Sequence, residues 1–166
     1  MDRKQVDAEF DAFVRRAYQR LCHAGYLLSG DWHKAEDATQ EALLRVHAKW
    51  ARIQDPEPYA RRSLMRLLVD ESRRPWRREA PQDEIRLESP TDPQTQIDDR
   101  DELSRALGHL TARRRACLVW RYFLDASVAE TAAALGCSEG NVKKLTSDAI
   151  AALRGILTDQ KIEELA

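Results

Sequence analysis

Apolar residues recur every three or four positions along almost the whole chain, and this spacing limits the fold more than any other feature. In the first 30 residues one helical face collects Phe10, Phe13, Val14, Ala17, Leu21 and Ala24. No run alternates apolar and polar residues with the period of two that a half-buried strand needs. The 166-residue chain is therefore predicted to be all-α.

Residues suited to helix ends separate the predicted helices. Gly30 can end a first helix over 7–28, and Asp31 can cap a second that runs to residue 50. The stretch "RIQDPEP" predicts a loop, and a third helix over 59–74 ends at Pro75. Shorter helices are predicted over 99–107, 112–123, 127–135 and 138–154, with Ser127 and Ser138 as caps of the last two.

The local charge changes sign in the middle of the chain. The net charge is only -1, but arginines crowd residues 61–78, whereas acidic residues and prolines crowd residues 79–98. Such an acidic stretch has too little apolar surface to fold. We therefore expect two small helical domains, 1–78 and 99–158, a flexible acidic linker over 79–98, and a short tail over 159–166.

Composition and motifs exclude several classes of protein. The cysteines Cys22, Cys117 and Cys137 are scattered and form no C-x-x-C, so neither a disulfide framework nor a zinc site is expected. No apolar run approaches the roughly 20 residues of a membrane span, and the charged N-terminus is no secretory signal. A cytoplasmic protein is predicted. Without a phosphate loop or nucleophile motif, we expect no enzyme, no metal and no cofactor.

The stretch "LGCSEGNVKK", residues 135–144, fits the elbow of a helix-turn-helix. This motif needs a small residue where its helices touch, a turn residue that tolerates left-handed geometry, and inward apolar residues. Ala132, Gly136 and Val142 supply these in turn, and Leu135 and Leu145 also point inward. A plain helical hairpin with an exposed lysine pair fits the same pattern.

Three stretches in the same order resemble a known family. They are "LLSGDWHKAEDATQEALLRVHAKW", "YARRSLMRLLVDESRRPWRRE" and "LGHLTARRRACLVWRYFLDASVAETAAALGCSEGNVKKLTSDAIAALR". They are similar to the polymerase-docking, minus-ten and minus-thirty-five regions of bacterial RNA polymerase sigma factors of the extracytoplasmic-function class. The chain most resembles the actinobacterial E-like subgroup, and the resemblance covers nearly its whole length.

The resemblance implies a dissociable promoter-specificity subunit with two kinds of partner. The first partner is core RNA polymerase, which would contact the chain with its β′ clamp helices and its β flap. The second partner is promoter DNA. The resemblance also implies a monomer when free, with no membrane contact, that an anti-sigma factor can hold inactive. The implied polymerase-binding residues, on the outward face of the second helix, are Asp37, Gln40, Glu41 and Arg45.

The DNA-binding residues implied by the resemblance form two groups. The minus-ten group is Arg61, Arg62, Arg66, Asp70, Arg73, Arg74, Trp76 and Arg77. The minus-thirty-five group is Ser138, Glu139, Gly140, Asn141, Lys143, Lys144, Ser147 and Asp148. Arginine forks suit phosphate oxygens, and the ring of Trp76 can stack on an unpaired base or pack against the helix end.

The sequence departs from the family at a few of these positions. Its "GNVKK" replaces the usual "GTVKS", Asp148 stands where an arginine is common, and Arg66 stands where an asparagine is frequent. These changes concern promoter preference. Two other functions remain open: a stand-alone helix-turn-helix regulator that binds its operator alone, and a helical adaptor that binds only protein.

Overall fold

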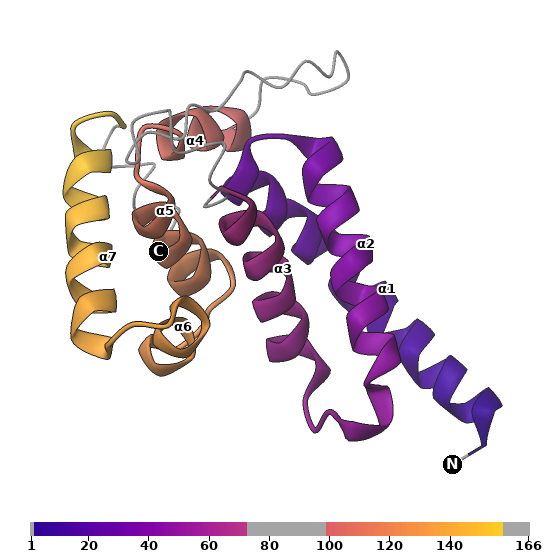
Figure 1. Ribbon diagram of the computed structural model, residues 1–166. Coiled ribbons are helices and arrows are strands. Elements are labelled where there is room, and N and C mark those ends of the chain that lie inside the picture. The colour runs from indigo at the N-terminus through magenta and orange to yellow at the C-terminus, as the bar shows by residue number, and fades with distance from the viewer. Residues whose placement is uncertain (1, 73–98, 158–166) are drawn as a thin grey trace.

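Helices make up every regular element in the part of the chain that the structure, a computed structural model, describes (Figure 1). This part covers residues 2–72 and 99–157, so the predicted linker and tail lie outside it. The order is α1 (Arg3–Ser29), α2 (Trp32–Ala48), a 3-10 turn η1 (Trp50–Arg52), α3 (Pro56–Ser72), α4 (Asp99–Leu107), α5 (Ala112–Leu118), a π-helical turn η3 (Val119–Phe123), α6 (Val128–Leu135) and α7 (Glu139–Arg154). The all-α prediction is confirmed.

The predicted junction between the first two helices is also confirmed. Gly30 has φ 74° and ψ 7°, the left-handed conformation that glycine adopts without a Cβ clash. Its N–H donates to the Tyr26 carbonyl (2.7 Å). The Asp31 carboxylate then accepts from the backbone N–H groups of His33 (2.9 Å) and Lys34 (3.3 Å) and starts α2.

The predicted loop "RIQDPEP" is wrong in its second half, because α3 already begins at Pro56. Proline suits the first turn of a helix, where its missing N–H needs no partner. The Asp55 carboxylate accepts from the Glu57 N–H (3.2 Å) and caps this turn. Other boundaries differ as well: α1 already begins at Arg3, α2 ends at Ala48, and the helix predicted over 112–123 widens into a π-helical turn from Val119.

The N-terminal half packs α1, α2 and α3 side by side (Figure 1). Their shared core includes Phe13, Leu21, Val46 and Leu64, all 3% exposed or less. Gly25 allows α1 and α2 to approach closely, since a Cβ there would lie 3.0 Å from the Cβ of Ala35. Burial of these apolar side chains holds α2 with its opposite face outward.

The C-terminal half packs against the N-terminal half. Helix α1 contacts α4, α5 and η3, and helix α3 contacts α5 and α6. Helix α7 packs on α5 and α6 at the outer side (Figure 1). A single apolar cluster runs through both halves, from Phe13 and Leu64 to Trp120 and Leu153. The two helical groups therefore share one core in the described structure.

Candidate functional site

The outer face of α2 carries the four predicted polymerase-binding residues. Asp37, Gln40, Glu41 and Arg45 are all exposed, and Arg45 donates from Nε to Glu41 Oε1 (3.3 Å) one turn earlier. Leu44 is also 64% exposed. At 3.6 residues per turn it falls between Gln40 and Glu41 around the helix axis. The sequence analysis missed Leu44, although an apolar residue on an otherwise polar face was the available signal.

The arginines at the start of α3 differ in what they contact. Arg61 donates to Glu57 Oε1 (2.7 Å), and its side chain is only 14% exposed. Arg62 and Arg66 lie one turn apart and are exposed. Two guanidinium groups therefore remain open to solvent on this helix, while the charge of Arg61 is balanced locally. The side chain of Asp70 and all of Arg73, Arg74, Trp76 and Arg77 lie outside the described residues.

Helices α6 and α7 form the predicted helix-turn-helix. Gly136 has φ 67°, so the left-handed turn is confirmed. Its N–H donates to the carbonyl of Ala132, the small residue at the contact between the helices. The Ser138 hydroxyl accepts from the Asn141 N–H (3.1 Å) and caps α7. Ala132 and Val142 are buried as predicted, whereas Leu145 is only partly buried. These contacts fix the angle between the two helices.

The outward positions of α7 are occupied as the sequence predicted. The exposed residues are Ser138, Glu139, Gly140, Lys143, Lys144 and Ser147, and Asn141 is half-buried. Asp148 is different because it has an ionic partner within the same half. Its Oδ2 lies 3.7 Å from Nη2 of Arg114 on α5, and both side chains are about two-fifths exposed.

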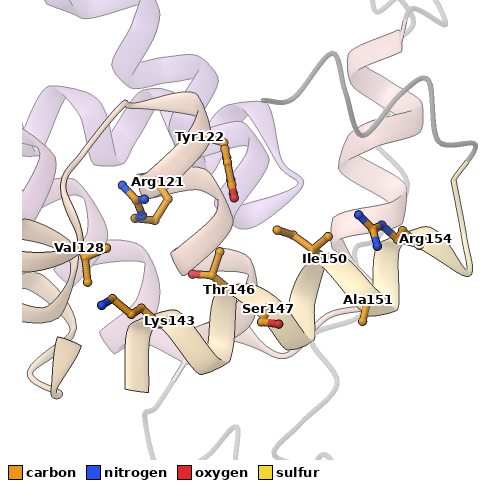
Figure 2. Close-up of a pocket in the computed structure, with 9 residues that line it drawn as sticks. All are labelled: Arg121, Tyr122, Val128, Lys143, Thr146, Ser147, Ile150, Ala151 and Arg154. Carbon is orange, nitrogen blue, oxygen red and sulfur yellow. The ribbon is translucent and has the colours of Figure 1, made fainter. Parts of the chain in front are cut away.

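A groove of about 440 Å³ runs between η3 and α7 (Figure 2). At one end Arg121 and Lys143 bring two cations together, and Arg121 is held by donating from Nη1 to the Ala126 carbonyl (2.7 Å). Further along α7 the lining changes to Ile150 and Arg154. The sequence analysis missed Arg121 as a neighbour of Lys143, because the two residues come from different helices.

The thiols have ordinary structural environments. Cys22 and Cys117 are buried and Cys137 is half-buried, all as free thiols. Burial raises the pKa of Cys117 to about 11, which disfavours the reactive thiolate. Among the described residues, no group of three or more histidine, cysteine or acidic side chains is arranged to hold a metal ion. None of the described helices is both long and apolar enough to span a membrane.

Comparisons with known proteins identify both halves. The family model "Sigma-70 region 2" matches residues 13–78, and "Sigma-70, region 4" matches residues 100–153. The RNA polymerase sigma-E factor of Streptomyces coelicolor is 34% identical over 163 residues, which cover 95% of this chain and 91% of that protein. The ECF RNA polymerase sigma factor SigL of Mycobacterium tuberculosis is 33% identical over 157 residues, 86% of this chain and 88% of that protein.

A solved structure shares the arrangement of the helices. The sigma factor RpoE of Bartonella quintana, solved in complex with the anti-sigma factor NepR, superposes with a TM-score of 0.74. It is 22% identical, and the match covers 91% of this chain and 98% of that chain. Both sigma-70 regions are thus present, in the order and with the helical architecture described above. The chain belongs to the extracytoplasmic-function class of RNA polymerase sigma factors, the subunits that direct transcription initiation at specific promoters.

Proposed function

We propose that the chain binds core RNA polymerase through the outer face of α2 and reads promoter DNA through α3 and α7. Residues 1–78 would dock on the polymerase and engage the minus-ten element, and residues 99–158 would read the minus-thirty-five element. The free protein would be a cytoplasmic monomer without enzymatic activity. The observation that carries the polymerase contact is the exposed stripe of Asp37, Gln40, Glu41 and Leu44 on a helix whose other face is buried.

Leu44 gives the α2 face an apolar centre within a polar rim. Interfaces that bind tightly commonly have this organisation, with a few central residues carrying most of the free energy. The carboxylates of Asp37 and Glu41 suit a basic partner surface, for which the β′ clamp helices are the proposed partner. Arg45 would keep the Glu41 side chain oriented through their contact of 3.3 Å.

For the minus-ten element, we assign the phosphate contacts first to Arg62 and Arg66. Both guanidinium groups are exposed on α3, and arginine binds phosphate oxygens in a bidentate manner. Arg61, paired with Glu57, would contribute less. Asp70, Arg73, Arg74, Trp76 and Arg77 stay assigned to the same element on the family resemblance.

For the minus-thirty-five element, the first two turns of α7 would enter the major groove. Exposure of the six outward residues named above supports this assignment. The backbone N–H groups at the Ser138 cap suit a phosphate, and Lys143 with Arg121 would hold the same strand. Tyr122 and Ile150, further along the groove in Figure 2, would offer apolar contact to the β flap.

The α2 face is tested with single alanine variants and purified core polymerase. Leu44→Ala should weaken binding by about 1–2 kcal/mol, roughly five- to thirtyfold in Kd, because a central apolar contact is lost. Asp37→Ala and Glu41→Ala should weaken it less, in a salt-dependent way. Asp11→Ala removes one exposed carboxylate from α1 and is the matched control, expected to bind like wild type.

Promoter recognition is tested by runoff transcription with holoenzyme. Lys143→Ala and Lys144→Ala should reduce the transcript without changing core binding, whereas Lys4→Ala, an exposed lysine on α1, should change neither. Normal transcription from the Lys143→Ala and Lys144→Ala proteins would mean that α7 is only a scaffold. Tight operator binding by the free chain, without polymerase, would instead identify a stand-alone regulator.

An anti-sigma factor is the remaining proposed partner. The relative from Bartonella quintana was solved with one, and masking of the α2 face would be enough to block polymerase. A competition experiment between core polymerase and a candidate inhibitor tests this, since the Leu44→Ala variant should lose affinity for both partners.

A further inference from the structure

The groove between η3 and α7 gathers positive charge without acidic neighbours. Arg121 and Lys143 line one end of it, and Arg154 lines the other end (Figure 2). None of the described residues that line it is acidic, and within residues 2–72 and 99–157 none of these three cations forms an ion pair with a carboxylate. Charges of one sign that line the same groove repel one another. The groove therefore suits an acidic occupant.

An apolar stretch separates the two charged ends of the groove. Tyr122 and Ile150 lie between them, and both are half-buried (Figure 2). Lys143 and Arg154 are about 16 Å apart along α7, at roughly 1.5 Å per residue. An occupant that fits the whole groove therefore needs acidic groups at both ends and an apolar group between them.

The segment 158–166 of the sequence has the matching order of side chains. It reads "TDQKIEELA", with one acidic residue near its start, an apolar residue in its middle and two acidic residues directly after that. In order these are Asp159, Ile162, Glu163 and Glu164. Lys161 is the one basic residue of the segment, so the side chains carry a net charge of -2. The segment lies outside the described residues.

The segment is attached at a point from which it can reach the whole groove. It follows Leu157, which is buried in the shared apolar core, and Arg154 at one end of the groove lies just before Leu157 in the chain. Residues 158–164 span at most about 23 Å when extended, which is enough to run back along α7 to Lys143. Such a short tether gives a local concentration in the roughly millimolar range, so weak contacts are sufficient.

We propose that residues 158–166 dock in this groove in the free chain, antiparallel to α7, and mask the cations that would hold the minus-thirty-five strand. In this arrangement Asp159 pairs with Arg154 and Ile162 packs on Ile150, while the two glutamates face the two cations at the far end. The segment and a phosphate strand need the same cations, so they exclude each other. The docking depends only on the groove, whereas its effect on DNA rests on the proposed function.

Carbodiimide cross-linking of the full, free chain tests the docking directly. The reagent joins a carboxylate to an amine without a spacer, so Lys143 should be joined to Glu163 or Glu164 in the monomer fraction, as mass spectrometry would report. Lys144 is also exposed but does not line the groove, and should be joined to them several times less. Equal yields at the two lysines would overturn the docking, and so would a Lys143 product found only in a dimer fraction.

The apolar contact is tested in the same assay. Ile162→Asn should lower the yield at Lys143 several-fold without a change of charge, because the packing on Ile150 is lost. Ile156→Asn is the matched control, since Ile156 is 46% exposed and does not line the groove, and it should cross-link like wild type. A yield that Ile162→Asn leaves unchanged would overturn the antiparallel alignment.

Binding of the free chain to a duplex tests the masking. The probe is a random-sequence duplex of about 20 base pairs, followed by fluorescence anisotropy near 0.1 M salt. Glu163→Gln combined with Glu164→Gln should bind about two- to tenfold more tightly than wild type, because two exposed ion pairs no longer compete with phosphate. Asp2→Asn combined with Asp11→Asn removes the same charge from exposed positions at the start of the chain and should have a much smaller effect.

The outcomes separate the docking, the masking and the sigma function. Equal gains in the glutamate variant and its control would show a general effect of net charge and overturn the masking. A lost Lys143 cross-link at unchanged duplex affinity would also overturn the masking and leave the sigma function standing. Failure of wild type and variants alike to bind core polymerase would refute the proposed function, while the Lys143 cross-link would still establish the docking.

Discussion

The effect expected of the Asp148 charge changes once its neighbour in the structure is known. In the sequence it places a negative charge on the helix expected to face phosphate. In the structure its carboxylate lies 3.7 Å from Arg114, so the charge is partly balanced within the protein and would repel a bound DNA strand less. Asp148 and Arg114 together form a polar pair beside the exposed lysines of α7.

A double-mutant cycle should measure this pair. Asp148→Asn and Arg114→Gln, alone and combined, should give a coupling of about 0.2–1 kcal/mol in urea unfolding, as is usual for a partly exposed ion pair. The coupling should shrink when salt rises from 0.05 to 0.5 M, because screening weakens the attraction. Strict additivity at low salt would show that the pair does not form in solution.

The thiols allow a second prediction for single residues. Burial raises the pKa of Cys117 to about 11, so near pH 8 this thiol is overwhelmingly protonated as well as shielded. Iodoacetamide should therefore modify half-buried Cys137 well before Cys117, as mass spectrometry of the folded protein would report. Equal modification rates of the two thiols in the native protein would contradict the burial of Cys117. Equal rates in urea would not, because unfolding exposes both thiols.

At the scale of the element, the helix-turn-helix depends on two local devices. Gly136 supplies the left-handed turn at φ 67°, and Ser138 supplies the cap of α7. The buried contact of Ala132 and Val142 then sets how far α7 projects from the core. This geometry leaves Lys143 and Lys144 exposed on the outer side of α7.

Two glycines near this elbow should respond oppositely to alanine. Gly136→Ala meets no atom within 4 Å but keeps a positive φ, so we expect destabilisation by about 1 kcal/mol from backbone strain alone. Gly140→Ala lies in the first turn of α7 with room for a Cβ, and should stabilise by about 0.5 kcal/mol. Urea unfolding measures both. Destabilisation by Gly140→Ala would mean that the first turn of α7 is not helical in solution.

At the scale of the whole molecule, the two helical halves share one apolar core. The outer face of α2, the proposed polymerase-binding face, is exposed while α1 and α3 contact the C-terminal half. With a net charge of -1, the chain has little general attraction for nucleic acid. Promoter affinity should therefore come from two weak DNA contacts, one in each half, that polymerase holds on the same promoter.

Duplex binding by the free protein should accordingly be weak. We expect a Kd of about 1–100 µM for promoter DNA near 0.15 M salt, with steep loss of affinity as salt rises. Fluorescence anisotropy would measure it, and holoenzyme should bind the same duplex far more tightly. A nanomolar Kd for the free chain would contradict this division of affinity.

Local signals in the sequence were sufficient for most of the fold. Apolar spacing and the caps at Gly30, Asp31 and Ser138 predicted the helices, because periodicity and capping act within a few residues. The start of α3 was missed, since Pro56 signals a loop and a first helical turn alike. The resemblance of three stretches, in their order and around an acidic linker, to known sigma-factor regions indicated the family.

Tertiary structure decided which predicted residues have partners outside their own helix. Arg61 with Glu57 is a pair within one helix and could have been anticipated from its spacing of four residues. The partner of Asp148 comes from another helix, α5, and no spacing encodes it. The same holds for Arg115, whose bond to Leu28 crosses 87 positions of the chain. Sequence by itself determined the helices because periodicity and capping act over short range, and it indicated the family through the resemblance of its motifs. Contact between the two halves depends on through-space packing, which only the folded molecule contains.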